Sequence, residues 1–434
     1  MMYYSTNGKA APATLRHAVV KGLAEDRGLY VPERIQRLSP DFFANFRDMD
    51  FAEIACHVAD AFFGVDIPQE ALHRIVRESL SFDCPIVPVD ADKYALELFH
   101  GPTLAFKDVG ARFMARMLRH FSDGELNVLV ATSGDTGSAV ANGFLGVEGI
   151  RVFVLYPEGK VSPIQECQFT TLGQNITAIA VDGVFDDCQA LVKQAFMDAS
   201  LNEERALTSA NSINVARFLP QSFYYFWACA QLKRRGVQEA PVICVPSGNF
   251  GNICAALYAK RMGLDVKRFI AANNANSVFY EYLRDGQYRP RPSVQTIANA
   301  MDVGDPSNFA RVLHLYGSHA AICADISGAT YNDTQIAQTI RDVKARTGYL
   351  CDPHGACGYR ALAEGLQAGE TGIFCETAHP AKFMDTVEAI LGEEVTVPEK
   401  LLAFTRGQRQ SVRMPNDYAA FRTFLLEHTK SQIQ

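Results

Sequence analysis

Short runs of apolar and β-branched residues alternate with longer segments of helical period from about residue 95 onward. Strands that are buried on both faces of a sheet have this composition, so the pattern predicts mostly parallel sheets covered by helices. The predicted fold class is therefore α/β. The predicted strands are NVLVAT (127–132), RVFVLY (151–156), NITAIAV (175–181), PVICVP (241–246), KRFIAA (267–272) and TGIFCET (371–377).

Residues 1–92 have a different pattern from the rest of the chain. They contain phenylalanine-rich stretches of helical period, such as DFFANFRDMDFAEIACHVADAFFG at residues 41–64, with little strand signal. We therefore predict a mainly helical amino-terminal domain. Further along, RRGVQEAP at residues 234–241 is a polar break before a new strand. This break divides the remainder into two predicted α/β domains, residues 93–236 and residues 237–434.

Composition and charge exclude several classes of protein. The 434 residues include 41 lysines and arginines against 48 aspartates and glutamates, so the net charge of -7 provides no global field to hold nucleic acid or an anionic membrane. No apolar run is long enough for a membrane span, and the first residues do not resemble an export signal. Eleven cysteines without CxxC spacing are typical of reduced, buried thiols. We expect a cytoplasmic protein, as a monomer or small homo-oligomer.

A glycine-rich turn, SGNFGN at residues 247–252, follows one of the predicted strands. Its glycines let backbone amides face a ligand, and the start of the next helix adds partial positive charge, so the turn suits a phosphate. A tight turn that needs glycine only for its backbone has the same pattern. The chain contains no G-x-G pair, so the dinucleotide fingerprint is absent.

Two further turns follow predicted strands and lead toward helices. In SGDTGSA at residues 133–139, Ser133 and Thr136 are candidates to bind a second anion or a carboxylate. The alternative is that Ser133 or Asp135 caps the helix. The third turn, TAHPAK at residues 377–382, begins with a hydroxyl-bearing threonine. Ligands of open parallel sheets bind at such strand ends.

Lys107 lies in the segment LELFHGPTLAFKDVGARF, directly after the apolar residues Leu104, Ala105 and Phe106. An apolar surrounding lowers the pKa of a lysine and makes the neutral amine available for Schiff-base chemistry. From the local context alone, a surface lysine that begins a helix beside Asp108 is the more favoured interpretation. The amine, the phosphate turn and the hydroxyl-bearing turn are together the parts that a pyridoxal-phosphate site needs.

Five motifs, taken together, resemble threonine synthases of the bacterial and fungal kind. They are HGPTLAFKDVGARF, ATSGDTGSA, NSINVAR, VPSGNFGN and TAHPAKF, and the resemblance covers nearly the whole chain. It implies the tryptophan-synthase-β fold (fold type II), with pyridoxal 5'-phosphate between two α/β domains and an extra amino-terminal domain. It also implies the reaction of O-phospho-L-homoserine with water, which gives L-threonine and phosphate.

The resemblance assigns roles to individual residues. Lys107 is implied to form the Schiff base with the cofactor, and Thr377 to meet the pyridine nitrogen. A neutral hydroxyl at that position does not hold the nitrogen protonated, which makes transamination less favoured than elimination and replacement. The residues implied to hold the cofactor phosphate are Gly248, Asn249, Phe250, Gly251 and Asn252.

The substrate carries a carboxylate and a phosphate, so two more anion sites are expected. We place the carboxylate at Ser133 and Thr136, and the phosphate at the NSINVAR segment, where Asn214 and Arg217 are the main candidates. A helix salt bridge on a solvated face is the alternative for Arg217. The role of Asp135 stays open, because an aspartate near the cofactor has to be protonated or paired with a donor.

Other functions stay open at this stage. A dehydratase, a cysteine synthase or a phospholyase of the same fold would share Lys107 and the SGNFGN turn, and a threonine-synthase-like protein without turnover would share the fold. The segment CDPHGACG at residues 351–358 has cysteine, aspartate and histidine, but its spacing matches no standard zinc pattern. We predict no metal site.

Overall fold

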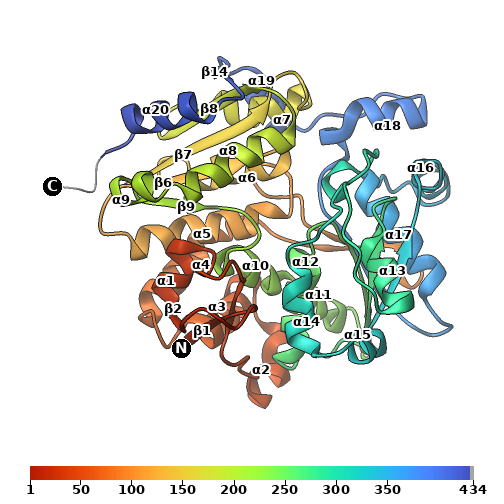
Figure 1. The fold of residues 1–434 in the computed structure, drawn as a ribbon. Coiled ribbons are helices and arrows are strands. Elements are labelled where there is room, and N and C mark those ends of the chain that lie inside the picture. The colour runs from red at the N-terminus through yellow and green to blue at the C-terminus, as the bar shows by residue number, and fades with distance from the viewer. Residues whose placement is uncertain (431–434) are drawn as a thin grey trace.

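The computed structural model describes residues 1–430, and Figure 1 shows the chain folded into a small amino-terminal domain and two larger α/β domains. The amino-terminal domain is mainly helical, as predicted, but it also has a three-stranded antiparallel sheet of order β2-β1-β3. Its elements are β1 (Met2–Ser5), β2 (Ala13–Thr14), α1 (Leu15–Lys21), β3 (Tyr30–Pro32), α2 (Pro40–Asn45), η1 (Phe46–Asp48), α3 (Phe51–Phe63) and α4 (Gln69–Ser79).

One α/β domain contains a fully parallel five-stranded sheet of order β14-β8-β7-β6-β9. Alternate residues of its strands enter different cores: Val128 and Val152 pack with α5 and α6, whereas Leu129 and Phe153 pack with α8 and α20. Both faces are therefore buried, which is why these strands are apolar throughout. The elements are α5 (Lys107–Phe121), β6 (Leu126–Ala131), α6 (Asp135–Phe144), β7 (Ile150–Pro157), α7 (Pro163–Thr170), β8 (Ile176–Asp182), α8 (Phe185–Met197), α9 (Ala199–Glu204), β9 (Leu207–Ser209), β14 (Val412–Pro415) and α20 (Tyr418–His428).

The other α/β domain contains a six-stranded sheet of order β12-β11-β10-β13-β5-β4, parallel except for the β4–β5 pair. The strands are β4 (Ile86–Asp90), β5 (Lys93–Glu97), β10 (Val242–Pro246), β11 (Arg268–Asn273), β12 (Ile326–Thr330) and β13 (Gly372–Glu376). The remaining helices are α10 (Val215–Phe218), η2 (Leu219–Gln221), α11 (Ser222–Arg234), α12 (Gly251–Arg261), α13 (Val278–Asp285), η3 (Asn299–Met301), α14 (Phe309–Tyr316), α15 (His319–Asp325), α16 (Asp333–Thr347), α17 (Pro353–Gly365), η4 (Pro380–Phe383), α18 (Met384–Leu391) and α19 (Glu399–Thr405).

The two sheets do not follow the contiguous division at residues 93–236 and 237–434. Strands β4 and β5, which precede Lys107, join the sheet built by the second half of the chain. Conversely, a strand from near the end of the chain joins the sheet built by the first half. This strand, β14, pairs with β8, and Figure 1 shows α20 beside the five-stranded sheet. Local hydrophobic pattern identifies a strand but does not identify its neighbour, so these exchanges were not predictable from the pattern.

Because β5 belongs to the six-stranded sheet, the turn that carries Lys107 is attached to that sheet. The residues after β13 pair with the residues before α5 through an antiparallel bridge between Ala105 and Ala378. Phe106 donates its backbone N–H to the Thr377 carbonyl at 2.9 Å. Lys107 therefore begins a helix of one domain while its turn is hydrogen-bonded to the other.

Gly110 allows α5, which begins with Lys107, to pack closely against α10. A Cβ atom at Gly110 would overlap the backbone carbonyl of Arg217. We expect Gly110→Ala to destabilise the protein by about 1–3 kcal/mol through overpacking, although alanine is the better residue inside a helix. The measurement is the midpoint of denaturant-induced unfolding. Gly124→Ala is the matched control, because nothing lies within 4 Å of its added Cβ; an equal effect of both changes would contradict the close-packing explanation.

Candidate active site

The SGDTG turn connects β6 to α6 and exposes hydroxyl groups. Gly134 has a φ of 148°, and a Cβ there would lie 2.6 Å from the Gln165 side chain, so only glycine fits. Thr132 Oγ1 accepts hydrogen bonds from the amides of Gly134 and Gly137 at 2.9 and 2.8 Å. Ser133 is exposed and Thr136 is half-buried. Neither Ser133 nor Asp135 caps α6 with its side chain, which leaves the proposed carboxylate contacts available.

The SGNFGN turn connects β10 to α12, and its side chains hold the shape of the turn. Asn249 donates to Ser212 Oγ at 2.6 Å and accepts from the Ser307 amide at 2.7 Å. Asn252 Oδ1 accepts from the hydroxyls of Tyr224 and Tyr225 at 2.5 and 2.6 Å. The Asn249 side chain and the Asn252 oxygen are engaged within the protein, whereas the buried Asn252 Nδ2 has no partner among residues 1–430. The backbone amides of the turn and of the α12 amino terminus, together with Asn252 Nδ2, are the groups suited to a phosphate.

Two backbone features of this turn depend on its sequence. Phe250 has a φ of 63°, in the left-handed region. A Cβ at Gly248 would lie 2.8 Å from the Ala300 carbonyl, so glycine is required for the close approach of residues 300 and 301. The turn is therefore strained and tightly packed, as expected where backbone is held in place for a ligand.

Lys107 is half-buried at the first position of α5. Burial lowers the pKa of its amine from 10.5 to about 8; Asp135 opposes this shift, whereas Lys382 and Arg217 add to it. The amine is thus much easier to deprotonate than that of a surface lysine, and the environment is not that of a solvated helix start.

Thr377 is buried directly after β13, and its carbonyl accepts the Phe106 amide. The two residues implied to hold opposite sides of the cofactor, Lys107 and Thr377, therefore lie on hydrogen-bonded segments.

Arg217 lies in α10 and is buried without a carboxylate partner in residues 1–430. Its only side-chain hydrogen bond there is from Nη1 to the Lys107 carbonyl at 3.4 Å, and Nε has no partner. Burial lowers the pKa of the guanidinium to about 10, with Asp108 opposing the shift. The salt bridge considered as the alternative for Arg217 is not formed. A buried, uncompensated cation beside Lys107 suits an anionic ligand.

Asn214 has a different environment from the one expected for a substrate contact. Its side chain is fully buried, Oδ1 accepts from the Ala216 amide at 2.9 Å, and Nδ2 donates to the Val19 carbonyl at 2.8 Å. Both ends of the amide are therefore engaged as the cap of α10 and as a contact to the amino-terminal domain. Each contact uses one hydrogen-bonding position of its atom, so the role of Asn214 in phosphate binding stays a prediction.

Arg311 was not singled out from the sequence, yet it supports the same segment. Its guanidinium is fully buried and donates to the carbonyls of Tyr30, Ser212 and Ile213. It also lies over the ring of Phe218, 4.0 Å from the centroid. The amino-terminal domain thereby holds the NSINVAR segment through both Arg311 and Asn214. No local sequence signal marks Arg311, because apart from Asn308 its partners come from two distant parts of the chain, Tyr30 and residues 212–218.

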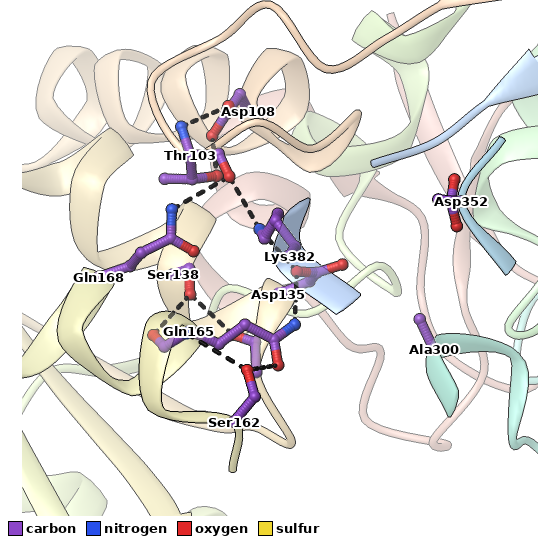
Figure 2. A network of polar contacts seen from close by, with 12 residues as sticks. Thr103, Asp108, Asp135, Ser138, Ser162, Gln165, Gln168, Ala300, Asp352 and Lys382 are labelled. Carbon is purple, nitrogen blue, oxygen red and sulfur yellow. Dashed lines mark hydrogen bonds and ion pairs between the residues drawn. The ribbon is translucent and has the colours of Figure 1, made fainter. Parts of the chain in front are cut away.

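Asp135 is paired with a donor, which was one of the two states expected for it. Figure 2 shows Lys382 pointing to Asp135, with Nζ 2.6 Å from Oδ1, and Gln165 Nε2 donates to the same oxygen at 2.9 Å. Burial alone would raise the pKa of the Asp135 carboxyl, but Lys382 and Lys107 hold it below its usual value. Lys382 lies within the TAHPAKF motif and was overlooked, since nothing local shows that it meets Asp135.

The CDPHGACG segment holds Ala300, which packs against the SGNFGN turn. His354 Nδ1 is 2.5 Å from Asp352 Oδ1, and its Nε2 accepts from the Ala300 amide at 3.1 Å. Ala300 is the residue whose carbonyl packs against Gly248. Burial raises the pKa of the Glu376 carboxyl, and the charge of Asp352 raises it further. Residues 1–430 contain no group of three or more histidine, cysteine, aspartate or glutamate residues arranged to bind a metal ion.

A cleft of about 690 Å³ adjoins Lys382 and Gln165. Its other walls come from residues 295–299 and from α19, and it contains none of Lys107, Thr377 or the SGNFGN turn. The Asp135 network therefore borders both the residues gathered around Lys107 and this cleft. No helix among residues 1–430 has the length and apolar character needed to cross a membrane.

The residues present fit pyridoxal phosphate: an amine with a lowered pKa, a phosphate turn closed to any side chain at Gly248, and a buried hydroxyl residue at the end of β13. Residues 89–373 match the family model described as pyridoxal-phosphate dependent enzyme. Fold and site therefore define a pyridoxal-phosphate-dependent enzyme of fold type II. Residues 2–80 match the threonine synthase N terminus, and residues 355–425 match the threonine synthase C-terminal region. The chain belongs to the threonine synthase family.

Individual relatives agree with this assignment along the whole chain. Threonine synthase of Escherichia coli (strain K12) is 45% identical over 429 residues, which cover 99% of this chain and 100% of the relative. The crystal structure of the Escherichia coli threonine synthase superposes with a TM-score of 0.92 at 44% identity, covering 99% and 100% of the two chains. The PLP-bound threonine synthase from Brucella melitensis has a TM-score of 0.94 at 35% identity, with 99% of each chain covered.

The pKa of Lys107 predicts how the cofactor-free protein captures pyridoxal phosphate. The neutral amine is the reactive form, so the capture rate should rise about tenfold per pH unit below the pKa and level off above about 8. The rate is followed by the absorbance of the bound cofactor after mixing at each pH. Lys107→Ala, which lacks the amine, is the control and should show no covalent capture. A midpoint near the ordinary lysine value of 10.5 would contradict the buried-amine interpretation.

Proposed function

We propose that this chain converts O-phospho-L-homoserine and water to L-threonine and phosphate, as its membership of the threonine synthase family indicates. The observation that carries the proposal is the buried, unpaired guanidinium of Arg217, which contacts the Lys107 carbonyl. An enzyme that eliminates phosphate needs an anion site close to the reacting amine, and Arg217 supplies a charge with no carboxylate partner among residues 1–430. The cofactor is pyridoxal 5'-phosphate, which Lys107, the SGNFGN turn and Thr377 are suited to hold.

Lys107 is the proposed catalytic residue. When bound, pyridoxal phosphate supplies an aldehyde for covalent attachment of an amine and a ring that accepts negative charge from the neighbouring carbon. The Lys107 amine removes a proton from the α-carbon of the substrate and returns protons in later steps. A pKa of about 8 suits both directions of transfer, because neutral and protonated amine coexist near neutral pH. Overall, phosphate leaves the γ-carbon and the oxygen of water is added at the β-carbon.

The proposed substrate contacts are divided between two elements. Ser133 and Thr136, at the amino terminus of α6, donate to the carboxylate, where the helix start adds partial positive charge. Arg217 binds the substrate phosphate through its free guanidinium edge. Asn214 keeps its structural role as the cap that orients Arg217 in the short α10. Gly248 to Asn252 bind the cofactor phosphate, and Thr377 meets the pyridine nitrogen.

The cellular setting is also a proposal. All eleven cysteines are free thiols, and ten of them are buried, with Cys323 the exposed one. Free thiols in this number suit a reducing compartment, so we place the protein in the cytoplasm. The net charge of -7 gives no general attraction to nucleic acid. A monomer or small homo-oligomer is sufficient for the site, since every proposed residue comes from one chain.

A product assay tests the proposed reaction against its alternatives. The purified protein is incubated with O-phospho-L-homoserine, and phosphate and threonine are quantified together. Equal amounts of both, abolished by Lys107→Ala, are expected. Phosphate with 2-oxobutyrate would instead indicate a phospholyase, and retention of the cofactor with no turnover would indicate a binding protein of the family.

Replacing Arg217 should weaken substrate binding without lowering the stability of the fold. Arg217→Met should raise the KM for O-phospho-L-homoserine by about 10- to 100-fold, the value of a lost hydrogen bond to a charged group. The same change should leave the unfolding temperature unchanged or raise it, because it removes a buried charge without a carboxylate partner. Arg413→Met, at an exposed position in β14, is the control for arginine removal. Loss of stability together with an unchanged KM would show that Arg217 is only structural.

A further inference from the structure

Lys382 is a buried lysine near the half-buried Lys107, and it joins the two α/β domains directly. It lies in η4, which follows β13 of the six-stranded sheet, whereas its partner Asp135 is the first residue of α6 in the other domain. The Lys382 side chain is completely buried, and that of Asp135 is 6% exposed. Removing two charges from water is costly unless further hydrogen bonds satisfy them, so a pair at this depth calls for a specific explanation.

The additional hydrogen bonds of Lys382 lead to the turn that carries Lys107. Lys382 Nζ donates to the Thr103 carbonyl at 2.8 Å, and Gln168 donates to the same oxygen at 3.1 Å. Thr103 in turn donates to Asp108 twice, from its amide at 2.9 Å and from Oγ1 at 2.6 Å, as Figure 2 shows. Lys107 lies between the two ends of this closed turn, so its position depends on the contacts of Thr103.

We propose that Lys382 and Asp135 are positioning residues whose ion pair links the two α/β domains and fixes the turn from Thr103 to Asp108, from which the reacting amine of Lys107 projects. This inference rests on the proposed function only in taking Lys107 as the reacting amine. Neither residue is required to contact the substrate. Gln165, in α7, also binds Asp135: its side chain donates to Asp135 and accepts from Ser162 Oγ at 2.9 Å.

The ion pair also presents two opposite charges to Lys107. Besides burial, the charged groups that act on the Lys107 amine are Asp135, which raises its pKa, and Lys382 and Arg217, which lower it. Removing one member of the pair should therefore shift the titration in the opposite direction from removing the other. The shifts test whether both charges lie close to the Lys107 amine, and hydrogen exchange at the turn tests whether the pair holds it in position.

The test is to titrate the Lys107 amine in the cofactor-free protein. Competitive acetylation with acetic anhydride over a range of pH, followed by mass spectrometry of the Lys107 peptide, gives the pKa without substrate or turnover. Lys382→Met should raise it by about one unit and Asp135→Asn should lower it by about one unit, the lower end of the effect of a charge a few ångströms away. The double variant should return close to the wild-type value.

Hydrogen exchange at the Phe106 amide, which donates to the Thr377 carbonyl, reports on the position of the turn. It should be faster in Lys382→Met than in the wild type. The matched control is Lys260→Met: Lys260 also pairs with an aspartate, Asp325 at 2.5 Å, and donates to a carbonyl, but lies at the far end of α12 from the SGNFGN turn. It should change neither measurement.

Shifts of equal sign in the two single variants, or no shift in either, would overturn the proposal, and so would unchanged exchange at Phe106. If Lys382→Met alone does not fold, Asp135→Asn and the neutral double variant suffice: the first must lower the Lys107 pKa and the second must restore it. The titration is independent of the product assay, so a failure here leaves the proposed reaction standing, and absence of threonine would leave these shifts unaffected.

Discussion

Phe106 donates its amide to the Thr377 carbonyl, and His379 donates its own to the Leu104 carbonyl at 3.1 Å. This short antiparallel pairing joins the start of α5 to the end of β13, and so attaches Lys107 to the sheet that also carries the phosphate turn. It exists because β5 lies next to β13 in the six-stranded sheet. The site can therefore form only when two parts of the chain that are some 270 residues apart have come together.

Charge is distributed very differently in the site and in the whole protein. The chain has a net charge of -7, yet Lys107, Lys382, Arg217 and Arg311 are gathered around the proposed anion sites, with the carboxylate of Asp135 as the nearby counter-charge. Within residues 1–430, Arg311 binds only carbonyl and amide oxygens, and Arg217 only a carbonyl. Burial strengthens the field of such cations. The protein itself neutralises only part of this charge, which leaves the remainder for the phosphate and carboxylate groups of ligands.

The amino-terminal domain contributes to the site indirectly. It supplies the Val19 carbonyl that binds Asn214 and the Tyr30 carbonyl that binds Arg311, so it holds the segment from which Arg217 projects. A role of this kind has no sequence signature. It explains why two residues of the segment NSINVAR have different surroundings. Among residues 1–430, Arg217 has no carboxylate partner, whereas Asn214 is the buried cap of α10.

The sequence by itself determined the local features: apolar strands, the glycine turns that follow them, the mainly helical start, and a lysine in apolar surroundings. These depend on residue type and short-range spacing, which hydrophobic burial and backbone sterics translate directly into structure. Its motifs also carried the family resemblance. Only the tertiary structure decided which strands neighbour one another, that Asn214 is engaged while Arg217 is free, and that Asp135 meets Lys382. Those outcomes depend on contacts between distant segments, and a buried polar residue acquires its role from the partner that folding places within hydrogen-bond distance.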